Sequence, residues 1–356
     1  MSFSAKWTQF FPPWNGAPIT EANLPSQAGK VFIVTGGSNG IGYELSRILY
    51  GAGGKVYMLT RSKQNAENAI AQIKDHYSAK GKGDPVEGKE EDAKNPGSLE
   101  FIHMDLMDFE TIKTATKEFL DREGPDGRLD TLFNNAGTGG LSNAPPNRQG
   151  HEYHFATNSL GPHLLTRLLT PILTKTAKQS PKDSVRVVWA ASVLVEMKSP
   201  EHGVRKEFMK DPFSIKDAAE LYASTKAANW FLASEFSRRQ SETGIYGSQV
   251  VHIAGNPGNY ATGIWRTVSA RINFAVKPLL FRGPVHGAET YMWMAFSDEV
   301  TMQDAVAGRY AMCDGRWHYG QRADLVQALK GEEEGGSGRA REYFEWCEEK
   351  IKEFVE

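Results

Sequence analysis

A tyrosine and a lysine four residues apart, Tyr222 and Lys226, have the spacing that most clearly suggests proton chemistry. They lie in the segment LYASTKAA, which has a helical pattern, so both side chains should share one face of a helix. A free phenol has a pKa of roughly 10 and stays protonated near neutrality. A neighbouring ammonium favours the phenolate, which would make Tyr222 a usable general acid or base.

A glycine-rich turn is the second feature that could bind a ligand. The apolar run 31–35 leads directly into TGGSNGIG, residues 35–42, where a helical pattern begins. Unpaired N–H groups and the helix dipole attract negative charge at such a helix N-terminus, which predicts a pyrophosphate site. The residues expected there are Gly36, Ser38, Asn39, Gly40, Ile41 and Gly42.

The elements that must position these residues follow from alternating patterns. Short apolar runs rich in β-branched residues predict strands, and helical patterns separate them. The strands are expected at Val31–Thr35, Val56–Thr60, Leu99–Met104, Thr131–Phe133, Val185–Ala190, Gln249–Ala254 and, last, Arg309–Met312. The main helices are expected at Ile41–Ala52, Phe109–Arg122, Tyr153–Lys178 and Ala218–Thr243, with a further helix that ends near Tyr77. This alternation predicts an α/β fold, a Rossmann-type doubly wound parallel sheet covered by helices on both faces.

We expect a single domain with additions at both ends. Residues 1–29 should form an N-terminal extension and residues 30–330 the domain, with a substrate lid at about 260–300. The charged stretch 78–98 indicates a solvated insertion, and residues 200–212 should be irregular. Residues 331–356 should comprise a flexible link, GEEEGGSG, and the amphipathic C-terminal helix Arg339–Val355.

The composition excludes several kinds of partner. Lys and Arg number 41 and Asp and Glu 43, a net charge of −2, so no nucleic-acid partner is expected. Cys313 and Cys347 are far apart and give no metal or disulfide pattern, so no metal is expected. This cysteine usage, with no signal sequence and no run long enough to span a bilayer, predicts a cytoplasmic protein. The apolar stretch 264–281 should pack on its own domain, with weak contact to a membrane surface as the alternative.

The order of the motifs resembles the short-chain dehydrogenase/reductase family. TGxxxGxG at 35–42, NNAG at 134–137, Ser192 after the fifth expected strand and YxxxK at 222–226 carry the resemblance, which covers roughly residues 30–262. It implies a nicotinamide cofactor and a catalytic group of Tyr222, Lys226, Ser192 and Asn158. Ser192 would polarise the substrate, and a water held beside Asn158 would connect Lys226 to solvent. Ala191 is a mild departure, since the family usually has Ser or Gly there.

The same resemblance implies further contacts with the cofactor. Asp105 and Leu106 would lie at the adenine, and Tyr222 and Lys226 at the nicotinamide ribose. The other implied contacts are Asn135, Ala136 and Gly137 at the adenosine ribose, and Pro257, Gly258 and Thr262 at the nicotinamide end. Two alternatives stay open: Asp105 as a helix N-cap, and Asn158 as a structural asparagine. Asn134 is expected to tie strands together.

Arg61 bears on the choice of cofactor. It follows the second expected strand in the sequence Thr60-Arg61-Ser62, which has no acidic residue to bind a ribose 2′-hydroxyl. A guanidinium group binds a phosphate strongly and specifically. We therefore expect NADP(H), with Arg61 as the contact to the 2′-phosphate.

The distance of 30 positions between Ser192 and Tyr222 is longer than in many members of the family. With Arg61 and the later GRYAMCDGRWH segment, it resembles the retinol dehydrogenase and WW-domain oxidoreductase branch, especially fungal members from secondary-metabolite pathways. This implies reduction of a carbonyl, or oxidation of an alcohol, on a lipophilic small molecule. The alternatives are a non-redox cyclisation or epimerisation and a non-catalytic NADP(H)-binding scaffold. A homodimer through 153–178 and 218–243 is implied too, unless the C-terminal extension blocks it.

Overall fold

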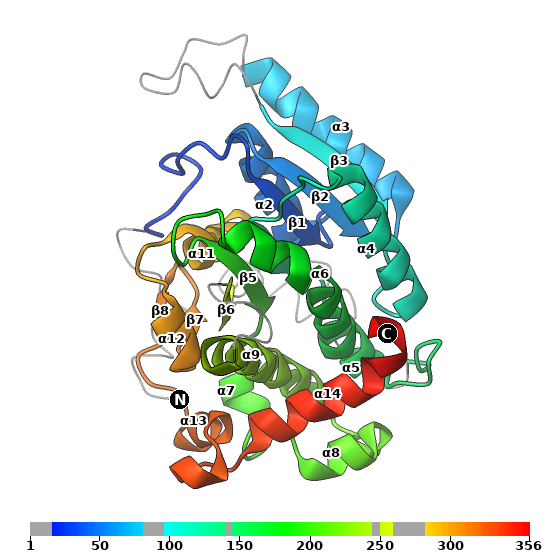
Figure 1. The fold of residues 1–356 in the computed structure, drawn as a ribbon, viewed down its shortest axis with the longest axis vertical. Coiled ribbons are helices and arrows are strands. Elements are labelled where there is room, and N and C mark those ends of the chain that lie inside the picture. Colours follow the sequence, from blue (N-terminus) through cyan, green and yellow to red (C-terminus); the bar gives the residue numbers. More distant parts are fainter. Residues whose placement is uncertain (1–15, 81–95, 140–143, 244–249, 259–281) are drawn as a thin grey trace.

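The computed structural model describes residues 16–80, 96–139, 144–243, 250–258 and 282–356 (Figure 1). Thr262, the apolar stretch 264–281 and most of the N-terminal extension lie outside these residues. The charged insertion is shorter than expected, because a helix continues to Lys80 and a strand begins at Ser98. Its central part, residues 81–95, is also outside the described residues.

Eight strands form one sheet in the order β3-β2-β1-β4-β5-β6-β7-β8. The strands are β1 (Val31–Thr35), β2 (Lys55–Thr60), β3 (Ser98–His103), β4 (Thr131–Asn134), β5 (Val185–Ala190), β6 (Val250–Gly255), β7 (Tyr310–Met312) and β8 (Arg316–Trp317). The pairs from β3 to β7 are all parallel, and only β8 runs antiparallel to its neighbour. The predicted doubly wound fold is confirmed, and its order reverses between β1 and β4, where such sheets bind ligands.

β8 was not expected from the sequence. It pairs with β7 across a short hairpin in which Asp314 and Gly315 both have positive φ, 63° and 64°. Asp-Gly favours this backbone in hairpins, so the turn had a sequence signal. A strand of two residues is too short for its own pattern to be recognised.

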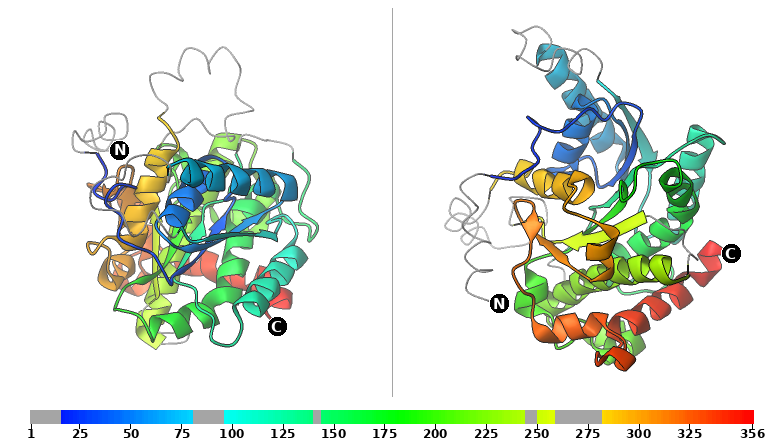
Figure 2. Two further views of the ribbon diagram at one scale, coloured as in Figure 1. Left: turned by 90° about the horizontal axis from the view of Figure 1, so that it is seen from above. Right: turned by 60° about the vertical axis from the view of Figure 1, so that its left-hand side comes forward.

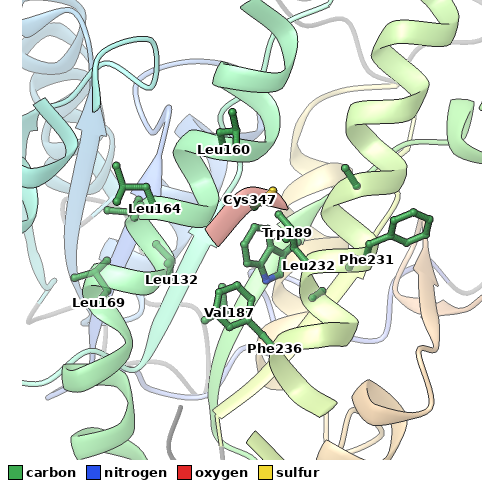
Figure 3. Close-up of a cluster of buried hydrophobic side chains, with 14 of the residues drawn as sticks. Leu132, Leu160, Leu164, Leu169, Val187, Trp189, Phe231, Leu232, Phe236 and Cys347 are labelled. Atoms are coloured by element: carbon green, nitrogen blue, oxygen red, sulfur yellow. The ribbon is translucent and has the colours of Figure 1, made fainter. Parts of the chain in front are cut away.

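Helices cover both faces of the sheet (Figure 2). One buried cluster joins the sheet to α2 (Gly40–Gly51), α3 (Lys63–Lys80) and α11 (Val285–Phe296). The other joins it to α4 (Phe109–Glu123), α6 (Gly161–Ala177) and α9 (Ala218–Thr243), and Figure 3 shows part of it. Along β1, Phe32 and Val34 belong to the first cluster and Val31 and Ile33 to the second, as the alternation of a strand requires.

Two helical expectations need correction. The long helix predicted for 153–178 is α5 (Tyr153–Phe155), a π-helical stretch (Ala156–Leu160) and then α6. A π-helical insertion is a single turn inside a helix, too short for a periodic pattern to reveal. The stretch 200–212, expected to be irregular, contains α8 (Lys206–Lys210) and follows the short α7 (Leu194–Lys198).

The C-terminal part is ordered rather than a helix on a flexible link. After α12 (Met302–Val306) and α13 (Ala323–Leu329), residues Glu332–Glu334 form a 3-10 turn. Ser337 N donates to Gln327 O at 3.0 Å and Gly338 N to Lys330 O at 3.0 Å, which fixes the link. The helix α14 (Arg339–Val355) then packs along α9 and α6 (Figure 1). No helix in the described part of the chain is long and apolar enough to cross a membrane.

Candidate active site

The glycine-rich turn joins β1 to α2 at the switch point of the sheet. Gly36 and Gly40 have positive φ angles, 65° and 56°, which residues with a side chain rarely adopt. A Cβ atom on Gly42 would lie 2.4 Å from Gly36 O and 2.7 Å from Asn135 Nδ2. The turn, the start of α2 and the end of β4 are therefore packed so closely that only glycine fits.

The NNAG residues brace this turn. Asn135 Nδ2 donates to Thr35 O at 2.8 Å, and Ala136 N donates to Thr35 Oγ1 at 2.9 Å. These bonds tie the end of β4 to the end of β1. Asn134, the residue expected to tie strands, instead donates through Nδ2 to Thr166 Oγ1 on α6 at 3.0 Å. Asn135 therefore has a structural role in addition to the ribose contact expected of it.

Arg61 follows β2 at the same edge of the sheet and is exposed. Its side chain makes no hydrogen bond or ion pair with any residue that the structure describes. Its carbonyl oxygen accepts a hydrogen bond from His103 Nδ1 at 3.0 Å, which fixes the backbone of Arg61 to the end of β3. Ser38 Oγ lies 3.4 Å from Thr60 Oγ1, so the glycine-rich turn is adjacent to this corner.

Asp105 lies beyond the end of β3, as expected, with Leu106 buried beside it. Its Oδ1 accepts a hydrogen bond from Met107 N at 2.9 Å. It is not the N-cap of the next helix: that residue is Asp108, which accepts from Glu110 N at 3.3 Å. The capping alternative for Asp105 is therefore wrong.

The four expected catalytic residues come from three elements. Tyr222 and Lys226 lie on α9, Ser192 follows β5, and Asn158 lies in the π-helical stretch. Lys226 Nζ is 5.8 Å from the centre of the Tyr222 ring and donates to Ala190 O at 3.1 Å. The side chain of Ser192 lies near enough to the Tyr222 hydroxyl to lower the pKa of that tyrosine. The structure thus brings Tyr222, Ser192 and Lys226 together.

Asn158 is fully buried and bonded on both ends of its amide. Its Oδ1 accepts from Thr138 N at 2.7 Å, and its Nδ2 donates to Thr138 O at 2.9 Å and to Thr225 Oγ1 at 3.0 Å. It therefore joins the loop after β4 to α9. A Cβ on Gly137 would lie 3.1 Å from Asn158 Oδ1 and 3.0 Å from Lys226 Nζ, so both groups border the space that Gly137 leaves.

Burial shifts the pKa values of Tyr222 and Lys226 in opposite directions. Burial raises the pKa of Tyr222 to about 12, although the neighbouring Ser192 side chain lowers it. Burial lowers the pKa of Lys226 to about 8. Both shifts arise because burial disfavours the charged form of a group. The expected lowering of the Tyr222 pKa by Lys226 is not found in the protein alone, where Ser192 is the neighbour that lowers it.

The segment after β6 carries the remaining expected residues. Pro257 O accepts from Thr290 Oγ1 on α11 at 3.3 Å, and Gly258, with φ of 114°, donates from its N–H to Asn256 Oδ1 at 3.0 Å. Both residues lie beyond the carboxyl end of β6, at the same edge as Ser192. Thr262 is outside the described residues. The range 260–300 was expected to form a substrate lid. Its helix α11 belongs instead to the core, because Tyr291 and Trp293 are only 1% and 0% exposed.

Three residues that the sequence did not single out complete the site. Thr138 and Thr225 bind Asn158, as described above, and Tyr310 on β7 binds the backbone of Ser192. Thr225 lies inside the YASTK motif and Tyr310 inside the GRYAMCDG segment. Both residues could therefore have been found from the motifs that contain them. Thr138 had no such signal.

Comparison with known proteins identifies the family. Residues 30–86 match the family described as short chain dehydrogenase. The chain is 37% identical over 354 residues to a short-chain dehydrogenase/reductase of Phomopsis amygdali, covering 99% of this chain and 98% of the relative. It is 35% identical over 349 residues to the short-chain dehydrogenase/reductase iacJ of Pestalotiopsis fici, covering 98% of each chain.

Solved structures share the fold at lower identity. A protein from Mycobacterium paratuberculosis has a TM-score of 0.65 and 22% identity, covering 94% of this chain and 97% of that one. The RhlG/NADP complex of Pseudomonas aeruginosa has a TM-score of 0.57 and 21% identity, covering 82% and 96%. On the identity to its fungal relatives, the chain belongs to the short-chain dehydrogenase/reductase family. It is therefore an oxidoreductase that uses a nicotinamide cofactor.

The residues present fit such a cofactor. The glycine-rich turn leaves backbone free of side chains at the N-terminus of α2, where a pyrophosphate is stabilised. Lys226 Nζ donates to one carbonyl among the described residues, which leaves it further donors for ribose hydroxyls. Within the described ranges, no group of three or more His, Cys, Asp or Glu side chains could hold a metal ion.

Proposed function

We propose that this protein uses NADPH to reduce a carbonyl group on a lipophilic small molecule to an alcohol. The main support for the proposal is that Tyr222, Ser192 and Lys226 lie close together beyond the carboxyl end of β5. Asn158 is bonded to the same helix, α9, through Thr225. The resemblance to fungal members of the family supports a role in the biosynthesis of a secondary metabolite.

The roles of the side chains follow from their chemistry. The nicotinamide cofactor supplies the hydride when it is bound. Ser192 donates a hydrogen bond to the carbonyl oxygen of the substrate, which stabilises the negative charge that develops there. Tyr222, whose pKa burial raises to about 12, is protonated at neutral pH and gives its proton to the same oxygen. Lys226 holds the nicotinamide ribose and, through Asn158 and water, restores the proton of Tyr222.

Arg61 supports NADPH rather than NADH. It is exposed at the corner where β2 ends, beside the glycine-rich turn, and its guanidinium has no partner among the described residues. A guanidinium in this position matches a 2′-phosphate, whereas the preference for NADH depends on an acidic residue that the chain lacks here.

The lipophilic nature of the substrate rests on the sequence between β6 and α11. This stretch follows Pro257 and Gly258 at the catalytic edge and is rich in large apolar side chains. They are Tyr260, Ile264, Trp265, Phe274, Leu279, Leu280 and Phe281. Apolar walls with a few polar groups are typical of sites for hydrophobic ligands.

A panel of carbonyl compounds tests the proposal. Long-chain aldehydes, aromatic aldehydes such as 4-nitrobenzaldehyde and alicyclic ketones are offered with NADPH and then NADH, and oxidation of the cofactor is followed at 340 nm. We expect turnover of at least one compound, with kcat/KM higher for NADPH. Arg61→Asp should shift that preference towards NADH, while Arg341→Asp, the same charge change on α14, should leave it unaltered.

Three results would contradict the proposal or a part of it. Conversion of a compound without oxidation of NADPH would indicate a non-redox cyclisation or epimerisation. Tight NADPH binding with no conversion across the panel would indicate a scaffold. An unchanged cofactor preference in Arg61→Asp would show that Arg61 does not select the phosphate.

A further inference from the structure

The hydroxyl of Tyr310 forms two hydrogen bonds with the backbone of Ser192. It donates to Ser192 O at 3.0 Å and accepts from Ser192 N at 3.2 Å. Ser192 lies just beyond the end of β5, and Tyr310 lies on β7, which is separated from β5 by β6. One side chain therefore fixes both peptide groups of the residue that is to hold the substrate oxygen.

The surroundings of Tyr310 hold its hydroxyl in place and protonated. The residue is 4% exposed, and its ring packs against Trp230 at 5.0 Å between ring centres. The Trp230 indole N–H donates to Gly308 O at 3.0 Å, which ties α9 to the start of β7. Burial raises the pKa of Tyr310 well above its usual value, so the hydroxyl keeps the proton that it donates to Ser192 O.

The rest of the segment after Ser192 is anchored to the same C-terminal part of the chain. His318 Nε2, just beyond β8, donates to Glu196 Oε2 at 3.0 Å. Arg322 donates through Nη1 to Ser199 O at 3.0 Å and through Nη2 to Pro200 O at 3.1 Å. The segment Ser192–Pro200 is thus held at its beginning, middle and end by residues from 310 to 322.

The long connection from β5 to α9 explains why this anchoring matters. Tyr222 follows Ser192 by 30 residues, so the chain between them does not by itself fix Ser192 relative to Tyr222. The serine hydroxyl must lie within hydrogen-bond reach of the substrate oxygen and of Tyr222, and small displacements from such a geometry cost much of the rate. Contacts from a third element can supply the missing constraint.

We propose that Tyr310 is a positioning residue that sets the place of the Ser192 hydroxyl against Tyr222 and the substrate carbonyl. Tyr310 acts through the backbone of Ser192 and takes no part in proton transfer. The inference rests on the proposed function insofar as Ser192 is catalytic. We call the two hydrogen bonds between the Tyr310 hydroxyl and the Ser192 backbone the clamp. The clamp does not depend on which reaction the protein catalyses.

The first test measures the clamp without any substrate. Tyr310→Phe keeps the ring and its packing but removes the acceptor of the Ser192 amide. The matched control is Tyr57→Phe: the Tyr57 hydroxyl donates to Glu123 Oε1 at 2.7 Å, and β1 and β4 separate its strand from β5. Hydrogen exchange followed by NMR should show the Ser192 amide protected in the unmodified protein. It should exchange at least about tenfold faster in Tyr310→Phe and at the unmodified rate in Tyr57→Phe.

The second test asks whether Tyr310 acts through Ser192. Reduction of 4-nitrobenzaldehyde, or of the best compound in the panel, is measured for Tyr310→Phe, Ser192→Ala and the double variant. We expect Tyr310→Phe to lower kcat by about tenfold and to leave the Kd for NADPH unchanged. In the Ser192→Ala background, the same substitution should change kcat by less than about twofold.

The outcomes separate this inference from the proposed function. A panel without any turnover overturns the proposed function, while the exchange experiment still decides the clamp. Rapid exchange of the Ser192 amide in the unmodified protein contradicts the clamp, even if Tyr310→Phe cannot be purified. Equal losses of kcat in both backgrounds would show that Tyr310 supports the protein generally and does not position Ser192.

Discussion

At the scale of single residues, burial shifts the pKa values of Tyr222 and Lys226 in opposite directions, which suits the different roles that we propose for them. Tyr222, with its pKa raised to about 12, keeps its proton throughout the neutral range and suits the role of acid. Lys226, with its pKa lowered to about 8, is close enough to neutrality to exchange its proton with the relay that we propose through water and Asn158. The reduction that we propose needs both groups protonated before the reaction.

The pH dependence of reduction should therefore follow Lys226. Because its pKa in the cofactor-free protein is about 8, the ammonium is present below that pH and is lost above it. We expect kcat/KM for NADPH, which reports groups of the free enzyme, to fall as the pH rises through about 8. Lys226→Arg, which keeps its charge at high pH, should abolish this fall. A constant kcat/KM between about pH 7 and 9.5 would contradict the role of Lys226.

The candidates for the catalytic residues could be named from the sequence, but their contacts could not. Tyr222 and Lys226 are recognised because i, i+4 spacing on a helix determines that they share a face. The partners of Asn158, Thr138 and Thr225, are 20 and 67 positions from it, so only the fold brings them together. For the same reason, Asn134 was expected to tie strands together, whereas the bond from the end of β4 to the end of β1 is made by its neighbour Asn135.

At the scale of elements, the glycine-rich turn is tightly packed because α2 begins in direct contact with the ends of β1 and β4. Local sequence was sufficient to predict this turn, since strand, glycines and helix follow one another in the chain. The π-helical stretch and strand β8 were not predicted, because both are too short to have a periodic pattern of their own.

Gly42→Ala tests the close packing of the turn. The added methyl group would lie 2.4 Å from Gly36 O and 2.7 Å from Asn135 Nδ2, so the turn must move. We expect the Kd for NADPH, measured by the fluorescence of the bound cofactor, to rise by more than about tenfold. Gly283→Ala is the matched control, because its methyl group would meet no atom of the described residues closer than Val285 Cγ1 at 3.9 Å. Equal Kd values for the two variants would contradict the tight fit.

At the scale of the whole molecule, α14 completes the face of the sheet formed by α6 and α9. Phe344 lies 5.1 Å from the ring of His163 on α6 and 5.1 Å from that of Phe236 on α9, and it is fully buried. Glu348 accepts hydrogen bonds from His163 Nε2 at 2.6 Å and from Arg167 Nε at 2.9 Å. Figure 3 shows Cys347 of α14 inside the cluster with Trp189 and Phe236.

The position of α14 leads to a prediction about assembly. The sequence left open whether helices 153–178 and 218–243 form a dimer or are blocked by the C-terminal extension. Because α14 buries its apolar face along both helices, we expect that surface to be closed to a second copy. Size-exclusion chromatography with light scattering should give a mass close to 39.4 kDa. A mass of twice that value would contradict the prediction.

The whole-molecule prediction from sequence succeeded for the sheet and failed for the C-terminal link. Alternating strands and helices leave few topologies, so the doubly wound sheet could be derived. The segment GEEEGGSG has the composition of a flexible link. In the structure, its backbone is held by hydrogen bonds to Gln327 of α13 and to Lys330, the residue that follows α13. Composition does not reveal such contacts.

The most direct test of the central claim is the substitution Tyr222→Phe, which removes the proton donor and keeps the ring. NADPH binding and the steady-state reduction of the best carbonyl compound are measured side by side. We expect a Kd for NADPH within about twofold of that of the unmodified protein and a kcat lower by about 10²–10⁴. Turnover that stays within about tenfold of the unmodified protein would contradict the assignment of Tyr222 as the acid.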